Sequence, residues 1–298
     1  MKKVLTYLKF GANSEPVLGQ FGQCVVSSFL KNKPKSDSEA LEVEVHCDLA
    51  PQGLVLEHAP ENSSKSVLLR HPPFCPMFHL SPELKENFVK TNHSGISVAV
   101  AVILESSDSK VMITRRPKHM RTFPNVWVPP GGSSEESETI LDTGLREVHE
   151  ETGLDVKPYM TKVEPLCLWE SVYPPLLAKG DPKRHQMVVY LHVVLEKCVQ
   201  DLIKETKLCP EETDAYAWLD LTEILIATDY STNLDTTKNL SLFAELKPDG
   251  SLEQKPKSYD MLRAEVPFSG SLDVERISTG TRFALEQFYA KKIRVSKI

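Results

Sequence analysis

The sequence predicts an α/β fold in which buried strands surround one central helix. Two apolar, β-branched runs, at residues 96–104 and 186–195, have the composition of strands buried on both faces. Between these runs, Leu141, Leu145 and Val148 recur at helical spacing and form one narrow apolar stripe. Buried strands combined with one amphipathic helix place the chain in the α/β class.

Composition sets limits on size and partners. The chain has 298 residues, of which 41% are apolar and 26% charged, enough for one large domain or two small ones. The net charge is −6 and no long basic run occurs, which argues against avid nonspecific binding of nucleic acid. No stretch approaches 18 uninterrupted apolar residues, so no membrane partner is expected. The oligomeric state stays open.

The six cysteines are scattered and include no CxxC pair. We therefore expect reduced thiols in the cytoplasm, and neither a disulfide framework nor a zinc site. His71 and His79 flank Cys75 in the segment HPPFCPMFH, which matches no known metal pattern, so a packed loop is expected there.

Residues 1–92 are predicted to form an N-terminal extension or small domain that is rich in strands. Its strand-like runs lie at 4–10, 23–30, 41–45, 53–56 and 66–69, with a polar loop at 31–39. A proline-rich linker at 72–76 and a short helix at 81–88 follow. No catalytic constellation is evident in it. The extension is expected to shape a substrate pocket or a dimer face.

A second domain is predicted at 93–238. Its first strand, at 96–104, is followed by a partner strand at 111–116 and by the turn Pro129-Pro130-Gly131-Gly132. After the central helix, two strands are expected at 162–172 and 186–195, with a long loop between them at 174–184. A third strand at 215–221 and a short helix at 221–228 follow.

Residues 239–298 are predicted to form a C-terminal connection and a docking helix. Residues 230–260 have the composition of a polar connection. Within 279–291, Phe283, Leu285, Phe288 and Tyr289 are spaced for an amphipathic helix that docks on the core.

The central helix carries the chemistry. Ser134 or Ser137 is predicted to cap its start, and Gly153 to stop it. Glu147, Glu150 and Glu151 share one arc beside the apolar stripe.

That arc opposes stability. Like charges at this spacing cost roughly 0.2–0.5 kcal/mol per pair on an exposed helix. A bound cation would turn this repulsion into a net attraction, and clustered carboxylates suit Mg²⁺ or Mn²⁺. Gly131 could add a backbone carbonyl ligand, and Arg146 could reach back to Glu138. The alternative, non-functional interpretation is an acidic helix face that is exposed to solvent.

The segment 132–154 resembles the Nudix box, G-x5-E-x7-R-E-U-x-E-E-x-G-U, in which U is aliphatic. Every position is filled, by Gly132, Glu138, Arg146, Glu147, Val148, Glu150, Glu151, Gly153 and Leu154. The order of strands around this helix is similar to the Nudix α/β/α sandwich with its mixed β-sheet. The resemblance covers about residues 93–228.

The resemblance implies a hydrolase that uses Mg²⁺ or Mn²⁺ to cleave a diphosphate linked to another moiety. It makes Glu147 and Glu151 the core metal ligands, and Glu150 a third ligand or the catalytic base. It also makes Arg146 and Glu138 an orienting ion pair. An acid from a later loop (Asp181, Glu211 or Glu212) is the alternative base.

The substrate is less sharply defined. Phosphates could be bound by Arg115, Arg116 and Arg121. The alternative is that these are ordinary surface arginines without a role in binding. Trp127, just before the PPGG turn, is a further candidate for substrate contact. The N-terminal extension, the VWVPPGG turn and the FALEQFY tail resemble a vertebrate branch of the family. That implies a small nucleotide substrate, a nucleoside diphosphate derivative, with the capped end of RNA as one candidate.

Two other functions stay open. The spacing of Thr114, Arg116 and Arg121 partly resembles the upstream motif of coenzyme A diphosphatases. Pro117, Asn125 and Pro129 depart from that motif. The other rival is a nucleotide- or RNA-binding module without catalysis, against which the intact acidic arc weighs.

The C-terminal tripeptide bears on localisation. Ser296-Lys297-Ile298 resembles the peroxisomal address S-K-L. A peroxisomal enzyme is therefore the alternative to a cytoplasmic one, and an ordinary basic tail is the favoured interpretation.

Overall fold

The computed structural model describes residues 3–11, 13–30, 41–50, 53–59, 66–91, 95–229, 239–265 and 274–295. The polar loop predicted at 31–39 and the proposed targeting tripeptide at 296–298 lie outside these ranges. Within them, no helix is both long enough and apolar enough to span a membrane.

The chain divides into two compact units. Unit 1 comprises Met1–Val100, Ser133–Thr143 and Cys167–Tyr190. Unit 2 comprises Ala101–Gly132, Gly144–Leu166 and Leu191–Ile298. The predicted domain boundaries at 92 and 238 stay a prediction.

Unit 1 is built on strands that the sequence predicted in outline. They are β1 (Leu5–Lys9), β2 (Val17–Leu18), β3 (Leu41–Ala50), β4 (Gly53–His58) and β5 (Val67–His71). Their order is β2-β1-β4-β3-β5, and β5 continues to β10 (Met160–Tyr173). β1 pairs with β4, and β5 with β10, in parallel, whereas β3 is antiparallel to both of its neighbours. The sheet is therefore mixed, as predicted.

One of the helices of unit 1 was predicted as a strand. They are α1 (Val25–Phe29), α2 (Pro76–His79), α3 (Pro82–Thr91) and the 3-10 turn η2 (Leu177–Lys179). The run at 23–30 was predicted as a strand, yet it holds α1. The Glu170 carboxylate accepts hydrogen bonds from the backbone N–H groups of Val25 at 2.7 Å and Val26 at 3.1 Å. These contacts come from a distant strand, so local pattern could not reveal them.

Unit 2 contains the predicted strands and some that were missed. They are β7 (Val111–Arg115), β8 (Val126–Val128), β12 (Ala215–Leu219), β13 (Phe243–Leu246), β14 (Leu252–Gln254) and β15 (Arg276–Ile277). Residues of β6 (Ser97–Glu105), β9 (Gly131–Ser133), β10 and β11 (Arg184–Leu195) belong to both units. The order is β14-β13-β12-β7-β6-β11-β10. β6 is buried along its whole length, as its apolar run predicted, and its partner strand β7 is buried as well. β13 and β14 fall in the expected polar connection.

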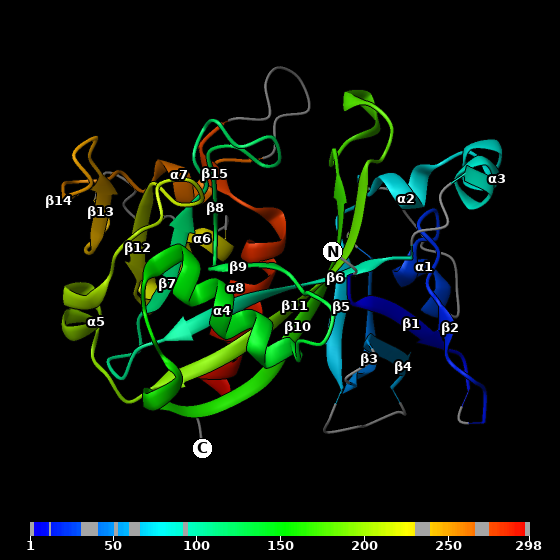
Figure 1. The fold of residues 1–298 in the computed structure, drawn as a ribbon, viewed down its shortest axis with the longest axis horizontal. Coiled ribbons are helices and arrows are strands. Elements are labelled where there is room, and N and C mark those ends of the chain that lie inside the picture. Colours follow the sequence, from blue (N-terminus) through cyan, green and yellow to red (C-terminus); the bar gives the residue numbers. More distant parts are fainter. Residues whose placement is uncertain are drawn as a thin grey trace. The chain divides into compact units, whose positions relative to one another are not determined.

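Helices lie in front of and behind the strands of unit 2 in Figure 1, with α4 in front and α8 behind. The helices and turns are α4 (Ile140–Thr152), η1 (Lys157–Tyr159), α5 (Val199–Glu205), α6 (Leu221–Thr228), α7 (Asp260–Arg263) and α8 (Thr279–Val295). The C-terminal helix docks as predicted, since Phe288 is fully buried and its ring lies 5.3 Å from that of His192 on β11.

The ends of α4 fix where its acids lie. The predicted caps, Ser134 and Ser137, are wrong. Instead, Thr139 caps the helix, because its Oγ1 accepts a hydrogen bond from the Asp142 N–H at 3.1 Å. The predicted stop is confirmed, since α4 ends at Thr152 and Gly153 has a φ of 71°.

Candidate active site

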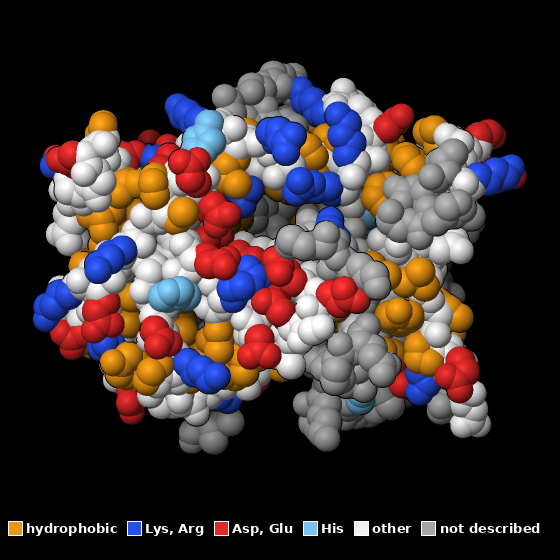
Figure 2. Space-filling model, in the orientation of Figure 1, with side chains coloured by type: hydrophobic (Ala, Val, Ile, Leu, Met, Phe, Trp, Pro, Cys, Tyr) orange, Lys and Arg blue, Asp and Glu red, His pale blue; other side chains and the backbone are white. Residues whose placement is uncertain are grey.

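Three carboxylates gather beside the last turns of α4. Glu147 and Glu151 lie one turn apart on the helix, and Glu212 comes from the loop before β12. One oxygen from each lies within 4.8 Å of the other two. We call these residues the acidic triad. Figure 2 shows Asp and Glu side chains gathered over the region of α4.

Backbone hydrogen bonds hold the Glu212 loop against the end of α4. The Lys207 N–H donates to the Thr152 carbonyl at 2.8 Å, and the Cys209 N–H to the Glu151 carbonyl at 3.1 Å. The Glu212 N–H closes a turn onto the Cys209 carbonyl at 3.0 Å. A Cβ on Gly153 would lie 3.0 Å from the Lys207 carbonyl oxygen, so glycine permits this approach. The loop thus satisfies carbonyls at the helix end while it presents Glu212.

Glu151 is the most perturbed member of the triad. Its side chain is 4% exposed and accepts hydrogen bonds from the Thr114 hydroxyl at 3.3 Å and the Gly131 N–H at 3.4 Å. Burial raises the pKa of Glu151 to about 8. The charge of Arg116 opposes this shift, and the charges of Glu147 and Glu212 add to it. Without a cation, the site thus disfavours the charged form of this carboxylate.

Glu147 lies against the turn that precedes the helix. A Cβ on Gly132 would fall 2.4 Å from Glu147 Oε1, so any larger residue would displace this carboxylate from its position. Burial also raises the pKa of Glu147, although its Arg146 partner, at 2.8 Å, opposes the shift. Burial therefore raises the pKa of both Glu147 and Glu151, and the third member of the triad, Glu212, is also an acid.

The triad fits a hard divalent cation. Its donor set consists of carboxylate oxygens, the ligands that Mg²⁺ and Mn²⁺ prefer. Such an ion would offset both the burial penalty and the repulsion among the three groups. Glu147 and Glu151, two of the predicted ligands, belong to the triad. Glu150 does not, and the predicted carbonyl ligand at Gly131 stays a prediction.

Arg146 connects Glu150 to the triad. Its Nη1 donates to Glu147 at 2.8 Å and to Glu150 at 2.9 Å. Half of the Glu150 side chain is exposed. Glu138 accepts hydrogen bonds from the Glu135 N–H at 3.0 Å and the Thr143 hydroxyl at 2.9 Å, which ties down the turn before α4. The predicted pairing of Arg146 with Glu138 stays a prediction.

Arg115 does not match its predicted role in phosphate binding. It is buried, and each guanidinium nitrogen bonds a carboxylate: Nε contacts Asp214 at 2.6 Å, Nη1 contacts Glu275 at 3.3 Å, and Nη2 contacts Glu245. Burial opposes the charge of Arg115, yet these acids raise its pKa. Its role is structural, joining β7, β13 and the segment before β15. The three acids lie far apart in the sequence, so no pattern signalled them.

Trp127 likewise belongs to the core and not to a substrate surface. It is fully buried, and its Nε1–H donates to Glu275 at 3.0 Å. Its ring lies 5.9 Å from that of Phe243. Its position next to the PPGG turn gave a false signal, because both Val126 and Trp127 of β8 are buried.

Arg116 and Arg121 stay candidates for phosphate contact. Arg116 is half-buried and donates from Nε and Nη2 to the Thr122 carbonyl, each at 3.2 Å. Its charge acts on Glu151, so it lies near the triad. Arg121 is exposed on the loop that follows.

Among the predicted alternative bases, the triad includes Glu212. Asp181 and Glu211 are exposed, and neither belongs to the triad of described residues. The sequence did not favour any one of these three acids. The hydrogen bonds of the 207–212 loop hold Glu212 beside the end of α4.

Comparison with known proteins agrees with this geometry. The family model for the NUDIX domain matches residues 95–240. The chain is 37% identical to the m7GpppN-mRNA hydrolase NUDT17 of Xenopus laevis over 290 residues, which cover 95% of this chain and 94% of that protein. It is 33% identical to the Danio rerio protein of the same name, over 96% of this chain and 95% of that one. For the Homo sapiens protein of that name, the identity is 38%, over 81% of this chain and 76% of that one. The sequence motif, the carboxylate geometry and these similarities together show that the chain belongs to the Nudix hydrolase family.

Proposed function

We propose that this Nudix hydrolase cleaves the diphosphate linkage of nucleoside diphosphate derivatives, with the 5′ cap of RNA among its substrates. The acidic triad is the observation that carries the proposal, because a cation-binding carboxylate group is what diphosphate cleavage needs. The names of the relatives, m7GpppN-mRNA hydrolases at 33–38% identity, support the cap as the substrate.

Mg²⁺ or Mn²⁺ would be held by Glu147, Glu151 and Glu212. Such a cation neutralises phosphate oxygens and makes water more acidic. The Thr114 hydroxyl and the Gly131 N–H orient Glu151 in this arrangement. Gly132 keeps the space beside Glu147 open.

Glu212 and Glu150 are the two carboxylates that can accept the proton of the attacking water. Glu212 lies in the triad and is exposed to solvent, so water reaches it. Glu150 is held by Arg146 at 2.9 Å and lies outside the triad. We assign proton acceptance to Glu212, through the carboxylate oxygen that would not hold the cation, while Glu150 orients Arg146, which in turn contacts Glu147.

The phosphates of the substrate carry negative charge that the triad alone would repel. Arg116 lies close enough to act electrostatically on Glu151, and Arg121 follows on the same loop. A guanidinium group suits phosphate oxygens because it donates in a planar fork. We infer that these two arginines hold the phosphates distal to the cation.

The substrate assignment is tested by a hydrolysis panel with Mg²⁺ or Mn²⁺. It contains m7GpppN-capped RNA, nucleoside diphosphate sugars and coenzyme A. Capped RNA should be cleaved within its phosphate bridge, and Glu151→Gln should abolish the cleavage. Cleavage of coenzyme A alone would favour the diphosphatase alternative. Binding of capped RNA without turnover of any compound would favour a binding module.

The two candidate bases are separated by their glutamine variants. Glu212→Gln should lower kcat by about 10²–10⁴-fold, the range typical of a lost general base. Glu150→Gln should lower it less, because Arg146 keeps its contact with Glu147. Rates measured at saturating Mn²⁺ and at several pH values check this, since loss of the base also removes the acidic limb of the pH profile. The reverse order of effects would contradict the assignment to Glu212.

The pKa of Glu151 predicts how pH acts on the cation-free protein. This carboxylate ionises near 4.5 in the unfolded chain and near 8 in the folded one, so folding is opposed increasingly as the pH rises between these values. The thermal stability of the wild type without added divalent cation should therefore fall over that range. Glu151→Gln should flatten the decline, while Glu150→Gln, the matched control, should retain it. Equal slopes in all three proteins would refute this account.

A further inference from the structure

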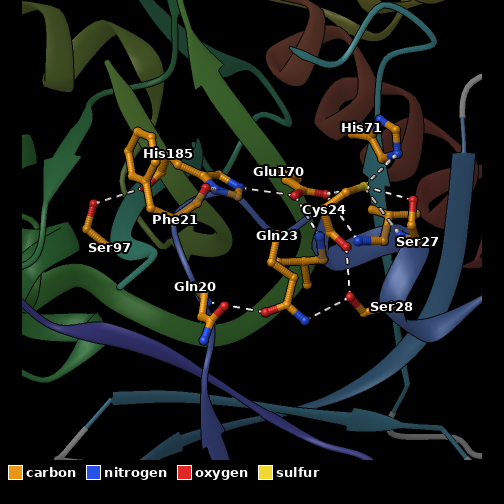
Figure 3. A network of polar contacts seen from close by, with 12 residues as sticks. Gln20, Phe21, Gln23, Cys24, Ser27, Ser28, His71, Ser97, Glu170 and His185 are labelled. Atoms are coloured by element: carbon orange, nitrogen blue, oxygen red, sulfur yellow. Dashed lines mark hydrogen bonds and ion pairs between the residues drawn. The ribbon is translucent and has the colours of Figure 1, made fainter. Parts of the chain in front are cut away.

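Unit 1 contains a second cluster of metal-ligand side chains, which the proposed hydrolysis does not use (Figure 3). Cys24 precedes α1, His71 ends β5, and Glu170 lies on β10. One ligand atom from each lies within 4.8 Å of the other two, and all three residues are buried. Cys75, which precedes α2 and is also buried, reaches the Cys24 thiol by a hydrogen bond between their side chains. Three ligand groups thus come together from three segments, and the Cys75 thiol lies beside one of them, Cys24.

The separations are those of a tetrahedral site. Cys24 Sγ lies 3.6 Å from His71 Nε2 and 3.6 Å from Glu170 Oε2. With Zn–S about 2.3 Å and Zn–N or Zn–O about 2.0–2.1 Å, two ligands of a tetrahedral Zn²⁺ lie about 3.6 Å apart. Both separations from Cys24 Sγ therefore match those of a tetrahedral zinc site, and the third pair, His71 and Glu170, lies within 4.8 Å.

His71 is oriented to offer a lone pair. Its Nδ1 lies 2.9 Å from the Pro72 carbonyl oxygen, which can only accept, so Nδ1 carries the proton. In the neutral ring, Nε2 then presents its lone pair to Cys24. Metal-bound histidines commonly donate their other ring N–H to a carbonyl in this way.

Glu170 has one acceptor position left on the side of the cluster. A carboxylate offers about four lone-pair sites. Oε1 accepts from the Val25 N–H at 2.7 Å and lies 3.0 Å from His185 Nε2, and Oε2 accepts from the Val26 N–H at 3.1 Å. The remaining position, on Oε2, accepts from the Cys24 thiol at 3.6 Å, and a metal ion that replaces the thiol proton would take this position.

The Cys24 sulfur is placed to accept hydrogen bonds. The Ser27 hydroxyl lies 3.0 Å from Sγ and the Ser27 N–H lies 3.5 Å from it. A neutral thiol is a weak acceptor, whereas a metal-bound thiolate accepts well. A metal ion would take the place of the Cys24 thiol proton.

We propose that Cys24, His71, Cys75 and Glu170 form a structural Zn²⁺ site within unit 1. Sulfur and nitrogen ligands select a borderline-soft cation such as Zn²⁺, unlike the oxygen-only triad on α4. With the Cys75 thiol, which lies beside Cys24, as the fourth ligand, no position would stay open, and the ion would join α1 and α2 to β5 and β10 instead of reacting. The site is independent of the proposed hydrolysis.

Metal analysis of the purified full-length chain, produced with Zn²⁺ supplied, tests the site. The wild type should carry about one equivalent of tightly held zinc. Cys24→Ser and Cys75→Ser should lose it, and so should His71→Ala. Two controls should retain it: Cys198→Ser, whose thiol hydrogen-bonds to Asp201 outside the cluster, and Glu151→Gln in the acidic triad.

A spectroscopic measurement on the wild type keeps the test decisive if a variant fails to fold. Exchange of zinc for Co²⁺ should give tetrahedral d–d bands and sulfur-to-cobalt charge-transfer absorption, which oxygen ligands of the acidic triad do not produce. A wild type that holds no zinc and shows no such absorption would overturn the proposal. Detection of a Cys24–Cys75 disulfide in the zinc-free wild type would overturn it as well.

Discussion

The mutual repulsion of Glu147, Glu151 and Glu212 is the constraint around which the candidate active site is arranged. Three carboxylates with oxygens inside 4.8 Å, two of them buried, oppose folding on their own. The chain tolerates them through particular local devices. Gly132 and Gly153 allow the turn and the loop to come close, and Arg146 supplies one compensating charge.

Much of this arrangement could be predicted from the sequence, because it depends on short-range spacing. Glu147 and Glu151 are one turn apart on any helix, and the stop at Gly153 follows from glycine's access to positive φ. The buried strand β6 was evident as a continuous apolar run, and β7 as its partner strand. These features depend on neighbours along the chain, which is why the sequence predicted them.

The cap of α4 was missed locally, since Thr139 caps it, but the larger errors share a cause, because each concerns a contact between distant segments. α1 was predicted as a strand, because nothing near it reveals that Glu170 satisfies its first N–H groups. Arg115 was predicted to bind phosphate, because its partners Asp214, Glu245 and Glu275 come from three separate segments. The choice of Glu212 over Glu211 depends on a turn closed by the Cys209 carbonyl. Such tertiary contacts leave no periodic signal.

The two ligand clusters differ in chemistry as well as in place. The triad offers hard oxygen ligands with one member open to solvent, which suits an ion that must also meet a substrate. The cluster around Cys24 offers sulfur, nitrogen and oxygen in a fully buried setting, which suits a closed structural site. CxxC spacing was absent from the sequence because these ligands come from four separate segments.

The most direct test of the central claim is to locate a divalent cation experimentally. Crystals of the full chain soaked in Mn²⁺, with data collected to use the anomalous signal of manganese, would show its position. The account predicts a peak within coordination distance of Glu147, Glu151 and Glu212, which should vanish in Glu151→Gln. A peak held by Glu150 and Glu138, with the triad left without metal, would contradict it.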